Sequence, residues 1–139
     1  MKTKYTEGGV HIINLVDGVG QESEFGDTIS VKYTGYLENG DVFDSTENRD
    51  APFTFPLGMG RVIKGWDEAF LGLRVGTKCT LIIPPEMGYG DKGQGPIPSN
   101  SILLFDVEVI KIAKQVKENM KKTFSEKVKK VNKQIGRTV

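Results

Sequence analysis

The sequence predicts an α+β fold in which an antiparallel β-sheet of about five strands has one short α-helix against a face. The chain has 139 residues, which suits one domain with a short appendage. Its 17 glycines and 6 prolines indicate many tight turns and favour a β-rich structure. Apolar and polar residues alternate in several segments, as in half-buried strands, whereas helical spacing occurs only once within residues 1–110.

Two strands are predicted before the dipeptide that most strongly indicates a hairpin. Val10–Val16 is an apolar run that ends at the turn-like residues Asp17–Gly20. Thr28–Leu37 alternates apolar and polar residues, so one of its faces is expected to be buried. Asn39-Gly40 then predicts a hairpin with a type I′ turn, because that turn needs a positive φ at both central residues.

Two short strands are expected after this hairpin. Val42–Ser45 is expected to pair with the strand that precedes the turn. Phe53–Leu57 follows it, and Pro56 indicates a sheet edge or a strand end because proline has no N–H to donate.

One helix and two further strands complete the predicted domain. Val62–Leu71 has apolar residues close to helical spacing and is the helix expected within residues 1–110. Thr77–Ile83 alternates, with Cys79 on its inward face, and Ile102–Ile112 is the last strand. This predicted inward position favours Cys79 as an inert, small hydrophobic side chain.

The charges divide the chain into an acidic body and a basic tail. Residues 1–110 hold 9 Lys/Arg and 16 Asp/Glu, a net charge of −7, whereas residues 111–139 hold 10 and 2, a net charge of +8. We therefore expect a folded domain at 1–112 and a basic amphipathic tail at 113–139, either helical or flexible. The apolar residues of the tail recur at three- and four-residue steps. They are Val116, Met120, Phe124, Val128, Val131 and Ile135.

Three interpretations of this tail stay open. It could fold onto the acidic body of its own chain, be largely disordered alone, or bind something else. The partners considered are an acidic protein, an anionic membrane surface, nucleic acid or a second copy of the chain.

The sequence also bears on the compartment. No segment approaches the roughly 20 apolar residues of a membrane-spanning helix, and no apolar run follows the two lysines near the N-terminus as it would in a signal peptide. The single cysteine cannot form an internal disulfide, so a reducing compartment is favoured and a cytoplasmic protein is expected.

The loop Gly88–Pro98 contains the spacing Gly-x-Gly-x-x-Gly of dinucleotide-binding loops. Such a loop opens a helix whose N-terminal amides hold the phosphates. Here Pro96 and Pro98 fall where that helix should run, and a proline inside a helix costs about 3 kcal/mol or more. We therefore predict a structured flap whose glycines allow sharp turns close to a ligand.

Other chemical sites are poorly supported. His11 is the only histidine and is expected to be structural or exposed, and no cysteine or histidine spacing suits zinc. No metal or cofactor is therefore expected. Asp44, Glu47 and Asp50 lie close together, which by itself indicates a solvated turn.

Aromatic residues are spread over the predicted strands and the helix. They favour either an ordinary core or a pocket in which a few polar groups orient a ligand. Two large residues of the flap, Tyr89 and Ile97, would border such a pocket. The other aromatic candidates are Tyr33, Phe43, Phe53, Phe55, Trp66 and Phe105.

Six blocks of sequence together resemble the FKBP-type peptidyl-prolyl cis–trans isomerases. Their order and spacing match that family over roughly residues 8–112, and the blocks with VIKGW and FDST are the most specific. The flap departs from the common pattern at Gln94 and Ser99. The blocks are YTGYLENGDVFDST (33–46), PF (52–53), LGMGRVIKGWDEA (57–69), GYG (88–90), IP (97–98) and FDVEV (105–109).

The resemblance implies a twisted antiparallel sheet wrapped around the helix, with an apolar pocket between them. Trp66 would form the pocket floor, and the Tyr89 hydroxyl and the Ile63 amide would donate to carbonyl groups of a substrate or inhibitor. Asp44 would lie at the pocket edge, oriented by Tyr33 and Arg49. The walls would be Tyr33, Phe43, Phe53, Val62, Ile63, Ile97 and Phe105.

The implied activity is rotation about X-Pro peptide bonds in proline-containing peptides and unfolded proteins, with rapamycin-type macrolides binding in the same pocket. A second hypothesis is a binding or chaperone module that uses the pocket as a receptor for proline peptides and the basic tail as an anchor. Enzymatic turnover separates the two, because only the first requires it.

Overall fold

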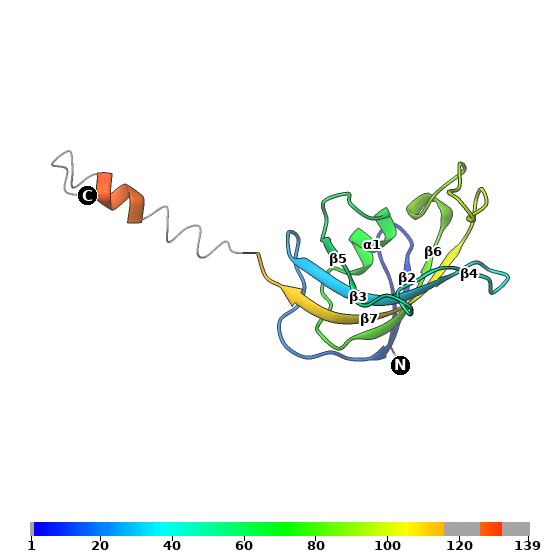
Figure 1. Ribbon diagram of the computed structural model, residues 1–139, viewed down its shortest axis with the longest axis horizontal. Coiled ribbons are helices and arrows are strands. Elements are labelled where there is room, and N and C mark those ends of the chain that lie inside the picture. The colour runs from blue at the N-terminus through cyan, green and yellow to red at the C-terminus, as the bar shows by residue number, and fades with distance from the viewer. Residues whose placement is uncertain (1, 116–125, 132–139) are drawn as a thin grey trace.

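The computed structural model describes residues 2–115 and 126–131 (Figure 1). Residues 2–115 form one antiparallel sheet of seven strands, not about five, with two short helices, α1 (Lys64–Ala69) and the 3₁₀ helix η1 (Pro85–Met87). The strands are β1 Lys2–Tyr5, β2 His11–Val16, β3 Thr28–Tyr36, β4 Val42–Ser45, β5 Phe53–Pro56, β6 Lys78–Ile83 and β7 Leu103–Ala113.

The strands follow the order β1-β2-β6-β7-β3-β4, and β5 pairs with β3. Each of the six segments predicted as strands belongs to this sheet, with ends within one residue of those expected. Pro56 pairs with Thr28 at the last position of β5, which confirms that this proline stands at a strand end.

Strand β1 is the one strand of the sheet that the sequence analysis missed. It pairs with β2 from Lys2 opposite Asn14 to Tyr5 opposite His11, and all four of its residues are exposed. Because neither face of β1 is buried, it has no apolar alternation to reveal it. Its side-chain contacts include the Tyr5 ring, which stacks on His11 with 4.3 Å between ring centroids, and Lys2, which pairs with Asp17.

The hairpin between β3 and β4 is present, but its turn is not the expected type I′. Gly40 has a φ of +92°, whereas Asn39 does not have a positive φ. The Gly40 N–H donates to the Leu37 carbonyl, and the Leu37 N–H donates to the Asp41 carbonyl, both at 2.9 Å. Residues 38–40 therefore form a three-residue loop closed by a glycine, the next most common kind of hairpin.

Helix α1 is shorter than the predicted 62–71. Ile63 precedes it with a ψ of 150°, and Phe70 ends it with an N–H that still donates to the Trp66 carbonyl. Gly65 permits close packing on the sheet, because a Cβ there would lie 2.8 Å from the Ile83 side chain. The first turn of α1 therefore packs closely on β6.

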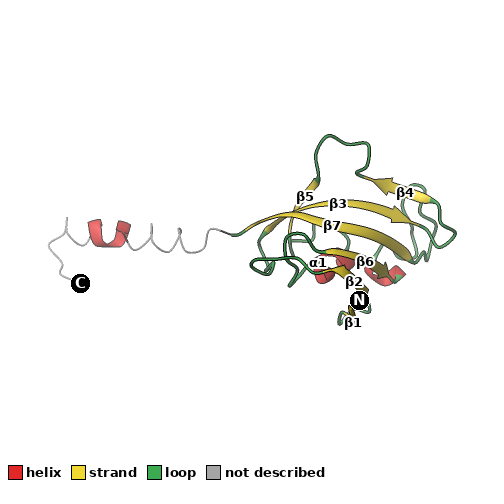
Figure 2. Ribbon diagram, turned by 90° about the horizontal axis from the view of Figure 1, so that it is seen from below, coloured by secondary structure: helices red, strands yellow, loops and turns green. Residues whose placement is uncertain are grey.

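The sheet curves over α1, so the core lies between one sheet face and the helix (Figure 2). Buried residues alternate with less buried ones along β6 and along β7 as far as Val109, as expected for a sheet with one covered face. Eight of the core side chains have no exposed surface, and the five largest of them come from the loop after β5, the end of α1, β6 and β7. These five are Leu57, Phe70, Leu81, Ile83 and Leu103.

The chain leaves the sheet at Ala113, and Lys114 and Gln115 bind the buried carboxylate of Asp27. Residues 126–131 are helical and exposed, and they include Val128 and Val131 of the predicted tail stripe. Among the described residues, every helix is too short or too polar to span a bilayer. The other four stripe residues, Val116, Met120, Phe124 and Ile135, lie outside the described residues.

Candidate active site

A cavity of about 300 Å³ opens between α1, the β3–β4 hairpin and the flap that follows η1. It brings together ten of the eleven residues that the family resemblance assigns to the site, and it adds Arg61, which was not among them. Eight of its eleven lining residues are apolar or aromatic. The lining is Tyr33, Phe43, Asp44, Arg49, Phe53, Arg61, Val62, Ile63, Trp66, Tyr89 and Phe105.

Trp66, the buried aromatic residue of α1, is the centre of this site. It is 4% exposed, and its indole is in edge-to-face contact with Tyr33 at 4.9 Å and with Phe105 at 5.2 Å between ring centroids. Such contacts add about 0.5–1.5 kcal/mol each to the burial of the rings. The floor of the cavity is therefore fixed by aromatic packing between α1, β3 and β7.

Phe43 and Phe53 complete the aromatic walls. Phe43 stands edge-to-face to Phe105 at 5.5 Å, and Phe53 does the same to Trp66 at 5.9 Å. Gly35 of β3 lies directly beneath two of these rings, because a Cβ there would come within 2.5 Å of Phe43 and 2.9 Å of Phe105. The walls therefore depend on a strand residue without a side chain.

A carboxylate at the edge of the cavity organises the polar groups. The Tyr33 hydroxyl donates to Asp44 Oδ2, and Arg49 Nη2 donates to Asp44 Oδ1 at 2.8 Å. The Ser45 N–H also donates to Asp44 Oδ1, at 2.9 Å. Burial and the bond to Asp44 together raise the pKa of Tyr33 to about 12, so its hydroxyl stays protonated.

Several donors in the cavity lining have no acceptor among the described residues, among them the Tyr89 hydroxyl and the Ile63 N–H. The Tyr89 hydroxyl is half-buried, and burial, with the nearby charge of Asp44, raises its pKa, so it remains a donor. The Ile63 N–H precedes the first turn of α1, where backbone amides have no intrahelical partner. Both groups are thus able to donate hydrogen bonds to a bound molecule.

Ile97 is the predicted wall residue that the structure does not place in the cavity lining. The N–H groups of Gln94 and Ile97 each donate to the other's carbonyl, at 2.9 and 2.8 Å, which closes a tight turn. This turn directs Ile97 into the core, where it is 6% exposed. Gly93 permits the turn because its φ is +65° and a Cβ would meet the Ile97 carbonyl at 2.4 Å.

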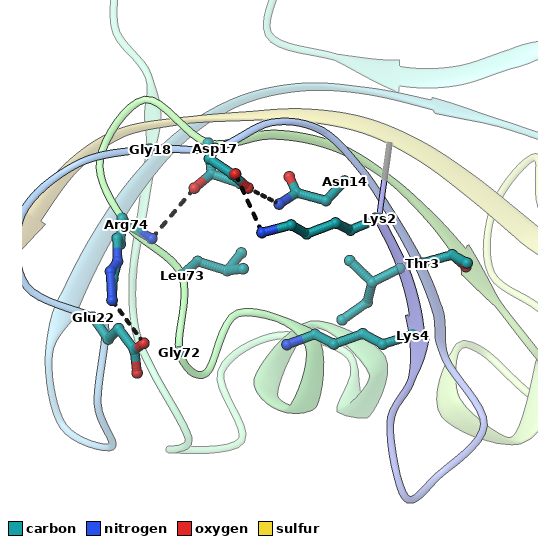
Figure 3. A pocket seen from close by; sticks show the side chains of 12 residues that line it. Lys2, Thr3, Lys4, Asn14, Asp17, Gly18, Glu22, Gly72, Leu73 and Arg74 are labelled. Carbon is teal, nitrogen blue, oxygen red and sulfur yellow. Dashed lines mark hydrogen bonds and ion pairs between the residues drawn. The ribbon is translucent and has the colours of Figure 1, made fainter.

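A second, larger cavity of about 740 Å³ lies between β1 and the loops around Asp17 and Arg74 (Figure 3). Its charged groups largely satisfy one another, since Lys2 pairs with Asp17 at 3.5 Å and Arg74 pairs with Glu22 at 3.0 Å. It lacks the aromatic lining that would hold an apolar ring. The smaller, aromatic cavity is therefore the better candidate for the active site.

The remaining chemical candidates are structural. Cys79 is 2% exposed, and burial raises the pKa of its thiol to about 11, so the reactive thiolate is disfavoured. His11 stacks on Tyr5 and contacts Thr3. Within residues 2–115 and 126–131, no group of three or more His, Cys, Asp or Glu side chains is placed to hold a metal ion.

Comparisons with known proteins identify the family of this chain. The family model of the FKBP-type peptidyl-prolyl cis–trans isomerases matches residues 20–110. An FK506-binding protein of Neisseria meningitidis serogroup B is 51% identical over 106 residues, which cover 76% of this chain and 97% of that protein. The FK506-binding protein 2 of Dictyostelium discoideum is 54% identical over 92 residues, or 66% of this chain and 69% of that protein.

Solved structures show the same fold. The crystal structure of AtFKBP13 has a TM-score of 0.74 and 42% identity, over 81% of this chain and 100% of that one. The crystal structure of FkpA from Escherichia coli also has a TM-score of 0.74, with 37% identity over 80% of this chain and 51% of that one. With an aromatic cavity, a matching sequence and a matching fold, this chain belongs to the family of FKBP-type peptidyl-prolyl cis–trans isomerases.

Proposed function

We propose that this enzyme accelerates rotation about X-Pro bonds in the cavity floored by Trp66, and that it thereby assists the folding of proline-containing proteins. The observation that carries the proposal is the aromatic enclosure, in which the rings of Tyr33, Phe53 and Phe105 surround the indole at 4.9–5.9 Å. An enclosure of this kind accommodates an apolar ring such as that of proline.

The chemistry requires neither a metal nor a proton-transfer group. Rotation must disrupt the partial double bond of the amide, at a barrier of about 18–20 kcal/mol. The planar amide is more charge-separated than the twisted one, so a dry apolar cavity disfavours the planar state relative to the transition state. Catalysis is then differential binding of the twisted amide, and each tenfold in rate requires about 1.36 kcal/mol.

The polar groups of the cavity orient the substrate in this proposal. The Ile63 N–H and the Tyr89 hydroxyl donate to substrate carbonyls, because neither has an acceptor among the described residues. Asp44 is held at the cavity edge by the Tyr33 hydroxyl and the Arg49 guanidinium, and it fixes the positions of these two side chains. Phe43 and Phe105 exclude water from the bond that rotates.

We also propose that macrolides of the rapamycin type bind in this cavity. The relatives of Neisseria and Dictyostelium are named as FK506-binding proteins, and a macrolide of that type could use the same aromatic floor and donors. Such a ligand should compete with proline peptides, because both would occupy one cavity of about 300 Å³.

Exchange NMR on a Leu-Pro peptide tests the proposal. We expect enzyme-dependent cis–trans exchange that saturating rapamycin suppresses, and a loss of at least about tenfold in kcat/KM for Phe43→Ala, since a wall of the enclosure is removed. The matched control is Val42→Ala, because Val42 is the neighbouring residue and is 57% exposed. Absence of exchange at high enzyme concentration would refute the catalytic proposal, and exchange that rapamycin leaves unchanged would refute the macrolide proposal alone.

A further inference from the structure

Arg61 is a cation in the cavity lining whose charge is not balanced locally. Only three of the eleven lining residues are charged, namely Asp44, Arg49 and Arg61. Arg49 is paired with Asp44 at 2.8 Å. Arg61 is exposed and forms no ion pair within the part of the chain that the structure describes. The lining therefore carries a net positive charge that resides on Arg61.

The loop that carries Arg61 is fixed in place by Asp67 of α1. The two carboxylate oxygens of Asp67 accept hydrogen bonds from the Gly58 N–H at 2.8 Å and the Gly60 N–H at 3.0 Å. Asp67 is the acidic residue closest to Arg61 along the sequence, and its oxygens are occupied by these amides. The same bonds thus hold the backbone of the loop and leave the guanidinium free to meet a ligand.

The position of Arg61 relative to the substrate follows from its neighbours. It lies two residues before Ile63, whose N–H we assign to a substrate carbonyl, and all of residues 61–63 line the cavity. We take a peptide bound with its proline ring over Trp66 to leave the cavity across this edge, because the Ile63 N–H that is assigned to its carbonyl lies there. A side chain next to the X-Pro pair therefore comes within reach of the guanidinium.

We propose that Arg61 is a specificity-determining residue that favours substrates with a glutamate or aspartate next to the X-Pro pair. This inference rests on the proposed isomerase function and names a substrate class for it. Because Arg61 is exposed, the preference should be modest, up to about fivefold in kcat/KM, in line with ion pairs at protein surfaces. Salt should weaken it, since the Debye length is only about 3 Å at 1 M ionic strength.

The test compares peptides that share a Leu-Pro core and differ in one flanking residue. Glu, Gln or Lys is placed either directly before the leucine or directly after the proline, and kcat/KM is measured for each at low and at high salt. For at least one of the two positions, we expect the wild-type protein to prefer Glu over Gln by about two- to fivefold at low salt. Arg61→Gln should bring the ratio of kcat/KM for the Glu and Gln peptides close to one. Arg61→Glu should instead prefer the Lys peptide over the Gln peptide.

For each protein, kcat/KM for the Glu and Lys peptides is divided by kcat/KM of the same protein for the Gln peptide. This ratio removes any general effect of the substitution on activity. The matched control is Arg74→Gln, because Arg74 pairs with Glu22 beside the other cavity and should leave the ratio unchanged. A Glu preference that persists in Arg61→Gln, or a wild-type protein with no preference at either position, would overturn the inference. If the wild-type protein did not catalyse isomerisation of the Gln peptides at all, the isomerase function itself would be contradicted.

Discussion

Asp27 and Asp44 are both carboxylates that accept hydrogen bonds from a cationic side chain, but they lie in different surroundings. The side chain of Asp44 is 40% exposed at the cavity edge, whereas that of Asp27 is 2% exposed. Asp27 accepts bonds from the Glu24 N–H, from Lys114 Nζ at 2.6 Å and from the Gln115 N–H. Burial alone would raise the pKa of Asp27, but these bonds outweigh it and lower the pKa below its usual value.

Asp27 should therefore make stability depend on pH. Because folding lowers its pKa, its contribution is fully present above about pH 4, the usual carboxyl pKa, and is lost as the pH falls through the lower folded value. Asp27→Asn should reduce the free energy of unfolding at pH 7 by about 2 kcal/mol, since Lys114 and two amides lose a charged acceptor. Urea unfolding of both proteins between pH 7 and pH 2 measures this difference.

The matched control is Asp17→Asn, because Asp17 is 64% exposed and pairs with Lys2 at the surface. It should change the free energy of unfolding by less than about 1 kcal/mol at any pH. If the deficit of Asp27→Asn were as large at pH 2 as at pH 7, the ionised carboxylate would not be its cause.

Strand β3 connects the core to the site at the scale of a structural element. It pairs with β4, β5 and β7, and it supplies Tyr33 to the cavity lining. Gly35 of this strand does not have a positive φ, so its backbone conformation does not require glycine. Glycine is required there because a side chain would have no space. The two rings that occupy this space are those of Phe43 and Phe105.

Gly35→Ala should lower catalysis by displacing these two rings. A Cβ would approach Phe43 to 2.5 Å and Phe105 to 2.9 Å, so the rings must move and the enclosure must open. We expect kcat/KM for a Leu-Pro peptide to fall about tenfold or more, with a loss of about 1–3 kcal/mol of stability from overpacking. Lys32→Ala, on the exposed side of the same strand, should change neither. Unchanged activity in a folded Gly35→Ala protein would contradict the assignment of these rings to the reaction.

The elements that a sequence predicts best are those with one buried face. Strands β6 and β7 and helix α1 were found because burial imposes a period on their residues. Strand β1 was missed because none of its residues is buried. The turn at Asn39-Gly40 was misassigned because only Gly40 of this dipeptide has a positive φ. Local signals give the hairpin, but the loop length depends on how β3 and β4 pair.

At the scale of the whole molecule, the sequence also revealed only part of the site. Its aromatic residues were identified by their place in family motifs, and the fold gathers residues from Tyr33 to Phe105 around one cavity. Arg61 was missed because the nearest acidic residue along the sequence, Asp67, binds the loop amides of Gly58 and Gly60 and not the guanidinium. Ile97 lies outside the lining because the turn at Gln94 directs it into the core. Neither effect is visible in the spacing of residues.

The central claim is that a proline ring enters the aromatic cavity and rests on Trp66. Trp66 is the only tryptophan of the chain, so its indole resonance does not overlap with that of another indole. Its buried Nε1–H has no acceptor among the described residues. The indole signal is followed by NMR while a Leu-Pro peptide is added, and its midpoint is compared with the KM for isomerisation. The account predicts a saturable shift of the Trp66 signal, with a midpoint near that KM and suppressed by rapamycin. Catalysed exchange with an unmoved Trp66 signal, and with shifts clustered instead around Leu73 in the larger cavity, would contradict it.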